Sequence, residues 1–176
     1  MAAADDAQSL SFADAAAWAE VVLLTVPFAA AHDVIDAAGG LAHKIVIDCT
    51  NAVAVDEDGP KLALDGETSA GEQIAAWAPE AQVFKSFNQL GLEALGGATD
   101  FAGHPPFMLV AGPDTDARKT IMQLVHDAGF DGQYIGGIQQ SRLLEAFAMV
   151  WIHLAGTKRT GRDWALKRIK LEKVND

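Results

Sequence analysis

The chain alternates short apolar runs with longer amphipathic stretches, and several of the apolar runs end in small or polar residues. A continuous apolar, β-branched run, typical of a strand covered on both faces, occurs at 21–26, and two further buried-strand patterns occur at 44–49 and 82–87. Further strands are predicted at 106–111 and 133–135, and helices at 13–19, 28–38, 69–79, 114–128 and 139–155. This alternation predicts an α/β fold with a parallel sheet and flanking helices.

Two of the predicted helices and one connection have distinctive sequence features. Ser69 has the position of an N-cap, and Glu72, three residues later, completes a capping box. Residues 52–67 contain Asp, Gly and Pro, which predicts a long loop after the second strand. The last helix carries large apolar residues along one side, namely Leu143, Phe147, Val150, Trp151 and Leu154.

The composition is that of an ordinary globular protein. Half of the 176 residues are hydrophobic and 21% are charged, so we expect a single domain over 1–176. The longest strongly apolar stretch, 146–154, is too short to span a bilayer. The acidic start of the chain lacks the basic region of a signal peptide. We therefore expect a cytoplasmic protein with no membrane partner.

The net charge of −11 is unevenly distributed along the chain. Residues 158–176 hold seven of the thirteen Lys and Arg residues and only three acidic residues. The acidic remainder of the chain argues against nucleic acid as a partner. The basic C-terminal tail at 158–176 is typical of a solvated helical end, and the alternative is a subunit contact or a grip on a phosphate.

Cysteine and histidine give little indication of catalysis or metal binding. Cys49 is the only cysteine and lies in an apolar strand pattern, which favours a buried, inert thiol over a nucleophile. The five histidines show no spacing typical of metal ligands, so we expect no metal site. Among them, His104 precedes a predicted strand and is the first to test.

Polar and small residues cluster where the first two predicted strands end. In the first cluster, Val26, Pro27 and Phe28 mark a strand that turns into a helix, whose free N–H groups could receive a phosphate or ribose oxygen. Any strand-to-helix turn can have this appearance. In the second, Thr50 and Asn51 follow a strand and could orient an amide or a sugar hydroxyl. The alternative is that both only cap the local loop.

The end of the third predicted strand carries Lys85 and Asn88. Strand alternation predicts Lys85 and Phe87 on one face, with Ser86 and Asn88 on the other. A lysine within an apolar strand needs a partner or a ligand, because burying an unpaired charge is costly. The alternative is a lysine at the sheet edge whose ammonium reaches solvent.

These motifs, in their order and spacing, resemble the deazaflavin-dependent NADP reductase family. The resemblance covers roughly 12–162 and rests on the runs VVLLTVP, IDCTN, TSAGEQIA, VFKSFN, MLVAG, DAGF and RLLEAFAMVWIHLA. The family is related to the N-terminal domains of pyrroline-5-carboxylate reductases and of membrane metalloreductases. It implies a Rossmann-like sheet, NADP(H) as cofactor and a small redox partner, with a deazaflavin as a possible co-substrate.

The resemblance also implies roles for the residues at the strand ends. Lys85 and Asn88 would border the pocket of the hydride acceptor. The residues on the nicotinamide side would be Val26, Pro27, Phe28, Thr50 and Asn51. Such an enzyme works mainly by positioning two planar rings, so the lack of an obvious nucleophile or base is compatible with it.

The sequence departs from this family in its first part. No G-x-G-x-x-G occurs in the 176 residues, so we expect an incomplete Rossmann-like domain that lacks the first β-α-β unit and its Gly-rich turn. The strand at 21–26 would then have an open apolar edge, which predicts a homo-oligomer or edge-strand pairing. The alternatives are that residues 9–12 partly cover the edge or that the chain is a fragment of a longer gene product. The leading hypothesis is an NADP(H)-dependent oxidoreductase domain. The alternative is a non-catalytic interaction or dimerisation module.

Overall fold

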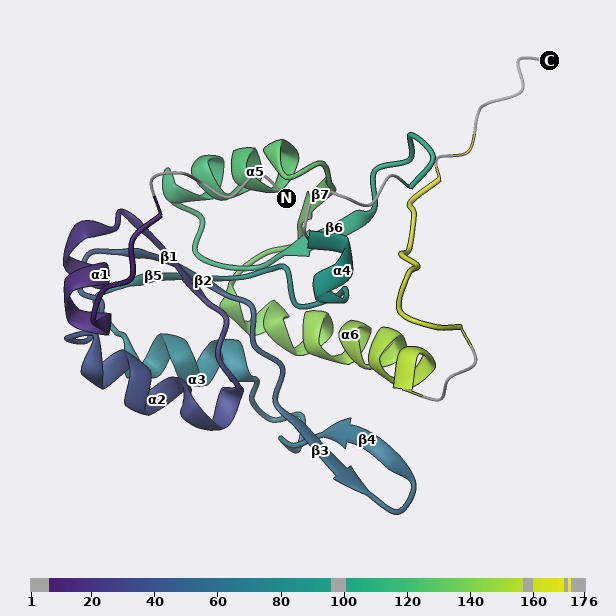
Figure 1. Ribbon diagram of the computed structural model, residues 1–176, viewed down its shortest axis with the longest axis horizontal. Helices are drawn as coiled ribbons and strands as arrows, with labels where there is room; N and C mark the ends of the chain where they lie inside the picture. The colour runs from purple at the N-terminus through teal and green to yellow at the C-terminus, as the bar shows by residue number, and fades with distance from the viewer. Residues whose placement is uncertain (1–6, 96–100, 157–159, 170, 172–176) are drawn as a thin grey trace.

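The computed structural model describes residues 7–95, 101–156, 160–169 and 171. Its central element is a parallel sheet of three strands in the order β1-β2-β5, formed by Val21–Leu24, Ile45–Asp48 and Gln82–Lys85. A second parallel pair joins β6 (Phe107–Val110) to β7 (Asp131–Tyr134). An antiparallel hairpin of β3 (Val53–Asp56) and β4 (Gly59–Leu62) projects from the body of the molecule (Figure 1).

Helices cover the central sheet on both faces, as the alternating pattern predicts. On one face lie α2 and α3, and on the other lies α5 (Figure 1). The helices are α1 (Phe12–Trp18), α2 (Phe28–Ala37), α3 (Ala70–Trp77), α4 (Leu92–Leu95), α5 (Ala117–Asp127) and α6 (Ser141–Gly156), with a 3₁₀ turn at Ile138–Gln140. The expected α/β class with a Rossmann-like parallel sheet and flanking helices is confirmed.

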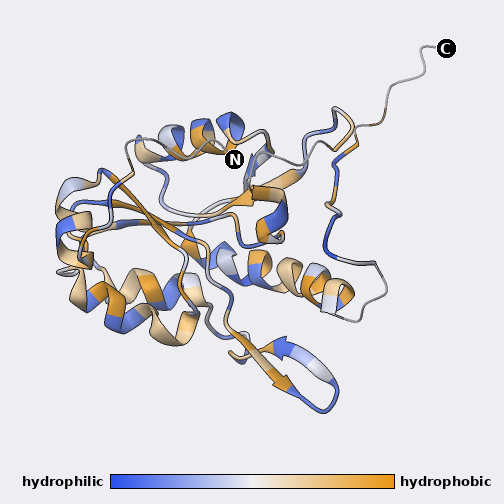
Figure 2. Cartoon of the chain, viewed as in Figure 1, coloured by the Kyte–Doolittle hydropathy of each residue, from blue (hydrophilic) through white to orange (hydrophobic). Residues whose placement is uncertain are grey.

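The strand residues point alternately into two apolar clusters, which explains why the strands are continuously hydrophobic. Val46 and Val83 pack with α2 and α3, whereas Ile47 and Phe84 pack with α5. Figure 2 shows the apolar strands crossing the middle of the molecule and hydrophilic residues on the outer side of α5. None of the described helices is both long and apolar enough to cross a membrane.

The predicted capping of α3 is confirmed. The Ser69 hydroxyl accepts a hydrogen bond from the Glu72 backbone N–H at 3.2 Å and donates one to the Glu72 carboxylate at 2.7 Å. Side-chain capping of this kind satisfies an N–H group that the helix itself cannot pair. It fixes the start of α3 beside the end of the central sheet.

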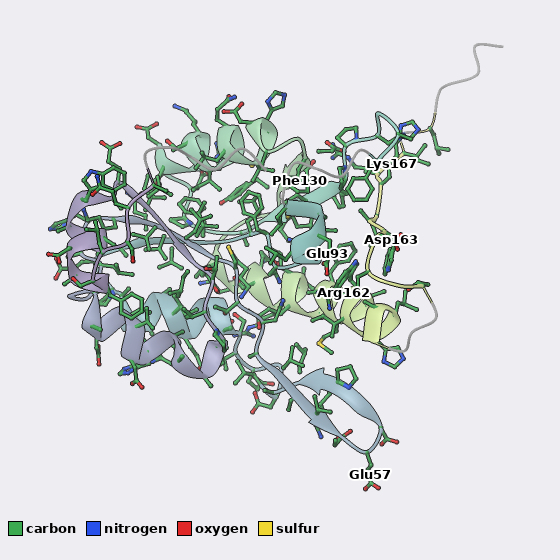
Figure 3. The ribbon with its side chains drawn as sticks, viewed as in Figure 1. Glu57, Glu93, Phe130, Arg162, Asp163 and Lys167 are labelled. Atoms are coloured by element: carbon green, nitrogen blue, oxygen red, sulfur yellow. The ribbon has the colours of Figure 1, made fainter. Side chains whose placement is uncertain are left out.

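The prediction of a long loop at 52–67 is wrong, because the β3–β4 hairpin lies within it. Gly59 and Pro60 occupy β4, and both residues weaken a strand pattern in the sequence. The strands are stabilised instead by their own pairing and by contact between β4 and α6. Figure 3 places Glu57 at the tip of the hairpin.

The predicted apolar side of the last helix holds for Trp151, which is buried, and is wrong for Leu143 and Val150, which are 59% and 50% exposed. The buried face of α6 contains Ser141, Leu144, Glu145, Ala148, Trp151 and Ala155. Most of these residues are small or polar without being exposed, so hydrophobicity alone does not mark this face.

The strands do not continue in parallel throughout. Lys85 at the end of β5 and Ala111 after β6 exchange two backbone hydrogen bonds, of 2.7 and 3.0 Å, in a single antiparallel bridge. The β6–β7 pair therefore joins the three-stranded sheet by a single backbone bridge, which side-chain hydrogen bonds of Ser86 and Gln89 with Leu109 supplement. This junction brings the end of β5 close to the loop after β6.

The described part of the basic tail, 160–169 and 171, is not helical, so the prediction of a helical end is wrong there. It lies along β6, where the Phe107 N–H donates to the Leu166 carbonyl at 2.8 Å. Arg168 forms an ion pair with Asp131 at 2.7 Å and lies over the Phe107 ring. The rest of the tail lies outside the described residues.

The outer edge of β1 is open in the part of the chain that the structure describes, where β1 pairs only with β2. A groove of about 530 Å³ runs along this edge, and Leu10 and Phe12 line it together with the strand. Leu23 is still 56% exposed, so residues 9–12 cover the edge only in part. Pairing of this edge with another strand stays a prediction.

Candidate functional site

The loops that follow β2 and β5 meet through a pair of asparagines. The Asn51 side-chain amide donates to the Asn88 carbonyl at 2.8 Å, and the Asn88 side-chain amide donates to the Asn51 side-chain oxygen at 3.0 Å. Asn88 also donates to the Leu144 carbonyl of α6 at 3.3 Å. The pair lies where the carboxyl ends of parallel strands meet, which is where open α/β sheets bind their ligands.

A cavity of about 470 Å³ opens beside the two asparagines. Its walls come from the hairpin, α4, α6 and the tail, and they are mainly apolar: Val53, Val55, Pro60, Leu90, Leu92, Trp151, Ile152 and Ala155. A concave, largely apolar space with a few convergent polar groups is the usual form of a small-molecule site. The cavity is therefore suited to a flat or partly apolar ligand that the Asn51 amide can orient, with Asn88 holding Asn51 in place.

The outer wall of the cavity is held by an ion pair and a stack of aromatic rings. Arg162 from the tail bonds to Glu93 of α4 at 2.7 Å and lies 5.4 Å from the centre of the Trp151 ring (Figure 3). The hydrogen bond from Arg162 lowers the pKa of the Glu93 carboxyl. Trp151 in turn donates to the Trp164 carbonyl at 3.1 Å, so the tail closes this side of the cavity.

Beneath the asparagine pair, the Lys85 ammonium is completely buried among three partners, of which the first two accept hydrogen bonds and the third is an ion-pair contact. They are the Asp48 carboxylate at 2.8 Å, the Thr50 carbonyl at 2.6 Å and the Glu145 carboxylate at 3.1 Å. The side chains of Lys85, Asp48 and Glu145 are 0%, 0% and 3% exposed. The prediction that Lys85 needs a partner is confirmed, and the alternative of an ammonium that reaches solvent is excluded.

Glu145 also anchors the start of α3. Its two carboxylate oxygens accept from the backbone N–H groups of Ala70 at 3.0 Å and Gly71 at 3.1 Å. A carboxylate is favourable there because the free N–H groups and the helix dipole both attract negative charge. At Gly71 an added Cβ would lie 2.7 Å from the Ser141 Cβ, so glycine is needed for this close approach of α3 to α6.

The loop at 48–51 is shaped by Asp48 more than by the residues expected to cap it. The Asp48 carboxylate accepts from the Thr50 N–H at 2.8 Å, which closes a local turn. The Thr50 hydroxyl oxygen is buried and has no hydrogen-bond partner among the described residues. Asn51 points across to Asn88 instead of capping its own loop.

The remaining predicted site residues lie at the end of the neighbouring strand. Phe28 stacks on Trp77 of α3 with ring centres 5.6 Å apart, and Val26 packs in the same apolar cluster. Pro27 is the N-cap of α2 and offers no side-chain hydrogen bond to its first turn. The structure thus pairs Lys85 with Thr50 and Asn51 with Asn88 through hydrogen bonds, and the two pairs adjoin because Thr50 and Asn51 are neighbours in the chain. Val26 and Phe28 pack instead in the apolar cluster with α2 and α3.

The alternation expected at the end of β5 breaks after Lys85. Phe87 has a φ of 58°, in the left-handed region, and it packs on Phe130 with the α5 cluster. Ser86 donates to the Leu109 carbonyl at 3.1 Å. Lys85 and Asn88 consequently belong to one connected network, although strand alternation placed them on opposite faces.

Three residues of the site were not anticipated: Glu145, Trp151 and Arg162. Glu145 did carry a signal, because it is a single acidic residue in the apolar run LLEAFAMVW. The reasoning applied to Lys85 applies equally to such a residue. Arg162 carried no comparable signal, since a basic residue in a basic tail has no specific expectation.

The Cys49 thiol is half-buried beside this network, in accord with the expectation of an inert thiol. Burial raises the pKa of the Cys49 thiol from 9.0 to about 12, and the charge of Asp48 adds to this effect. The thiol therefore stays protonated, and poorly nucleophilic, throughout the neutral range.

This pKa shift predicts a loss of stability at alkaline pH. The unfolded chain releases the Cys49 proton near pH 9 and the folded chain only near 12, so stability is complete below about pH 9 and falls as the pH rises between these values. At pH 10 the Cys49 contribution is a loss of about 1.4 kcal/mol. Urea unfolding at pH 7 and pH 10 should show a smaller alkaline loss in Cys49→Ala than in the unaltered protein. Equal losses would contradict the prediction.

A solved structure from Arthrobacter sp. FB24, assigned as an F420-dependent NADP-reductase, is similar to nearly the whole chain. It is 30% identical, with a TM-score of 0.79 over 90% of this chain and 73% of that one. The chain belongs to the coenzyme F420-dependent NADP oxidoreductase family. The family model described as NADP oxidoreductase, coenzyme F420-dependent, matches residues 2–52.

Other solved structures share the fold of this chain. A hypothetical protein, SMa0349 from Sinorhizobium meliloti, is 26% identical, with a TM-score of 0.64 over 74% of this chain and 62% of that one. A reductive aminase from Aspergillus terreus, solved with NADPH and ethyl levulinate, shares the fold at 16% identity and a TM-score of 0.56, over 84% and 46% of the two chains. The comparison with curated protein sequences gave no match.

The residues present fit one end of the cofactor that this NADP oxidoreductase family uses. The asparagine amides beside an apolar cavity suit a nicotinamide, which offers a flat ring and a carboxamide. The buried Thr50 hydroxyl, which lacks a partner among the described residues, adds a further polar group near this end. The 176 residues contain no G-x-G-x-x-G turn, which is the motif that usually holds the pyrophosphate of the cofactor.

Proposed function

We propose that this protein is an NADP(H)-dependent oxidoreductase that transfers hydride between a nicotinamide and a small redox acceptor such as a deazaflavin. The observation that carries the proposal is the Asn51–Asn88 amide pair, which lines a cavity of about 470 Å³ at the carboxyl ends of parallel strands. The name of the similar Arthrobacter protein supports a deazaflavin as the acceptor.

In this proposal, residues at different strand ends position the nicotinamide and the hydride acceptor. Thr50 and Asn51 lie beside the nicotinamide, and Val26, Pro27 and Phe28 form the wall at the start of α2. Asn88 borders the acceptor, and its amide is held in place by Asn51 and by the Leu144 carbonyl. Bound NADPH supplies the hydride, and the protein contributes the orientation of two rings and the exclusion of water.

Titration with NADPH tests the proposal directly. We expect saturable quenching or enhancement of NADPH fluorescence by the folded protein, and turnover when a deazaflavin is added. Asn88→Ala should lower turnover by up to about 100-fold, because misplacement of a reacting ring is costly. Circular dichroism serves as the control that the variant is folded. Absence of saturable binding at millimolar NADPH would exclude the proposed activity for this chain, and unchanged turnover would remove Asn88 from the site.

A second candidate function is a non-catalytic interaction or dimerisation module, and the open β1 edge favours it. Leu23 and Trp18 on this side are 56% and 84% exposed, and a groove of about 530 Å³ follows the strand. Unpaired strand edges of this kind readily accept another strand. The mass of the protein in solution tests it. A monomer at high concentration contradicts edge pairing between copies, whereas a dimer that Leu23→Lys dissociates supports it.

A further inference from the structure

We propose that Lys85 is a positioning residue: from its buried site it fixes the Thr50 carbonyl and, through it, the Asn51–Asn88 amide pair at the cavity. The inference deepens the proposed function by assigning this role within the same site. Its geometric part holds for the protein whether or not NADPH binds.

The Lys85 ammonium has partners on three parts of the fold. It donates hydrogen bonds to the Asp48 carboxylate at the end of β2 and to the Thr50 carbonyl in the loop that follows. It also forms an ion pair with Glu145 on α6. These contacts connect the loop to both a strand and a helix.

The loop at 48–51 is held on both sides of Thr50. Its N–H donates to Asp48 at 2.8 Å, and its carbonyl accepts from Lys85 at 2.6 Å. The peptide that carries this carbonyl is the one that leads into Asn51. The direction of the Asn51 side chain is therefore set by the two contacts that hold Thr50.

Lys85 is also close in sequence to Asn88, the second member of the amide pair. Asn88 follows Lys85 by three residues, and the turn between them passes through Phe87 with a φ of 58°. Asn51 and Asn88 are joined to each other by two hydrogen bonds, of 2.8 and 3.0 Å. The contact of Lys85 with the Thr50 carbonyl therefore bears on Asn51 directly and on Asn88 through the hydrogen bonds between the two asparagines.

A role in packing alone does not explain a charged residue here. Methionine has a similar length and would fill the same apolar volume, whereas an ammonium must be removed from water. The charge is matched to two carboxylates, one of which is also held by the start of α3. Lysine thus adds over methionine the ion pairs with Asp48 and Glu145 and the directed hydrogen bond to the Thr50 carbonyl.

The test compares Lys85→Met with Ile121→Ala, a core truncation on the α5 face that leaves the network intact. The readout is solvent exchange of the Asn51 and Asn88 side-chain amide protons, measured by nuclear magnetic resonance. We expect exchange to become at least about tenfold faster in Lys85→Met, because the amide pair loses its fixed geometry, and to stay unchanged in Ile121→Ala. Unchanged exchange in folded Lys85→Met would overturn the inference.

Two further measurements separate this inference from folding and from the proposed function. If Lys85→Met does not fold, nuclear magnetic resonance of the unaltered protein provides the test. A scalar coupling between the Lys85 ammonium and the Thr50 carbonyl supports the inference, and its absence overturns it. If NADPH turnover is observed, kcat should fall in Lys85→Met while the KM for NADPH changes little. If neither protein binds NADPH, the proposed function fails, and the amide exchange still decides the role of Lys85.

Discussion

Replacing Glu145 with alanine is expected to lower the free energy of unfolding by about 3–5 kcal/mol, the usual cost of removing one partner from a buried ion pair. Glu145 is 3% exposed on its side chain and lies 3.1 Å from the Lys85 ammonium. Its loss also leaves the N–H groups of Ala70 and Gly71 without their acceptor. Each unsatisfied buried group adds to the cost, because it has exchanged water for no partner.

Urea unfolding followed by far-ultraviolet circular dichroism measures this loss. Glu145→Gln is the matched variant, since its amide oxygen still accepts one N–H of α3 while the negative charge is gone. It should lose part of the stability, and the difference between the two variants reports the acceptor role alone. Lys119→Ala, which removes an exposed ion pair with Asp116, should change little. A loss below about 1 kcal/mol in Glu145→Ala would contradict a structural ion pair at this site.

The central sheet could be predicted from sequence because its strands are covered on both faces. Val46 and Ile47 are neighbours in the chain, yet both are buried, one against the α2–α3 side and the other against α5. Successive positions in the middle of such a strand are apolar on both faces, which gives a pattern that is easy to recognise. The cap of α3 was equally predictable, because its hydrogen bonds join residues only three positions apart.

The hairpin and the tail could not be predicted for the opposite reason, since their stability comes from distant contacts. Gly59 and Pro60 are unfavourable in a strand, but β4 pairs with β3 and packs on α6. The tail carries a basic pattern that fits an exposed helix, yet Arg168 finds Asp131 and the Phe107 ring. Local sequence propensity carries no information about partners that are distant in the chain.

The sequence indicated which residues lie at the candidate site, but it did not indicate which of them form hydrogen bonds with one another. Asn51 and Asn88 were both identified from the strand ends, but nothing in the sequence shows that their amides bond to each other. Lys85 was correctly expected to need a partner, and the partner on α6 came from a residue 60 positions away in the chain. The helical face that carries Glu145 was only partly predicted, because polar residues on a buried face look like solvent-facing ones.

Replacing Trp151 with alanine is expected to cost about 3–5 kcal/mol of stability and to open the wall of the candidate site, because a large buried ring leaves a cavity that its surroundings cannot fill. Trp151 is 6% exposed and lines the cavity beside the asparagine pair. Its ring stacks on Trp164 at 6.1 Å and lies beneath Arg162 at 5.4 Å. The variant therefore removes the surface on which the tail is held.

Trp151→Phe separates the ring from the hydrogen bond. Phenylalanine keeps an aromatic face for Arg162 but has no N–H for the Trp164 carbonyl, so its loss should be nearer about 1 kcal/mol. Circular dichroism is the suitable probe of unfolding, because both variants alter the tryptophan fluorescence. If the cavity holds the hydride acceptor, binding of a deazaflavin should weaken strongly in Trp151→Ala and only slightly in Trp151→Phe. Equal stability of Trp151→Ala and the unaltered protein would show that the tail and α6 do not depend on this ring, and equal deazaflavin binding would place the acceptor elsewhere.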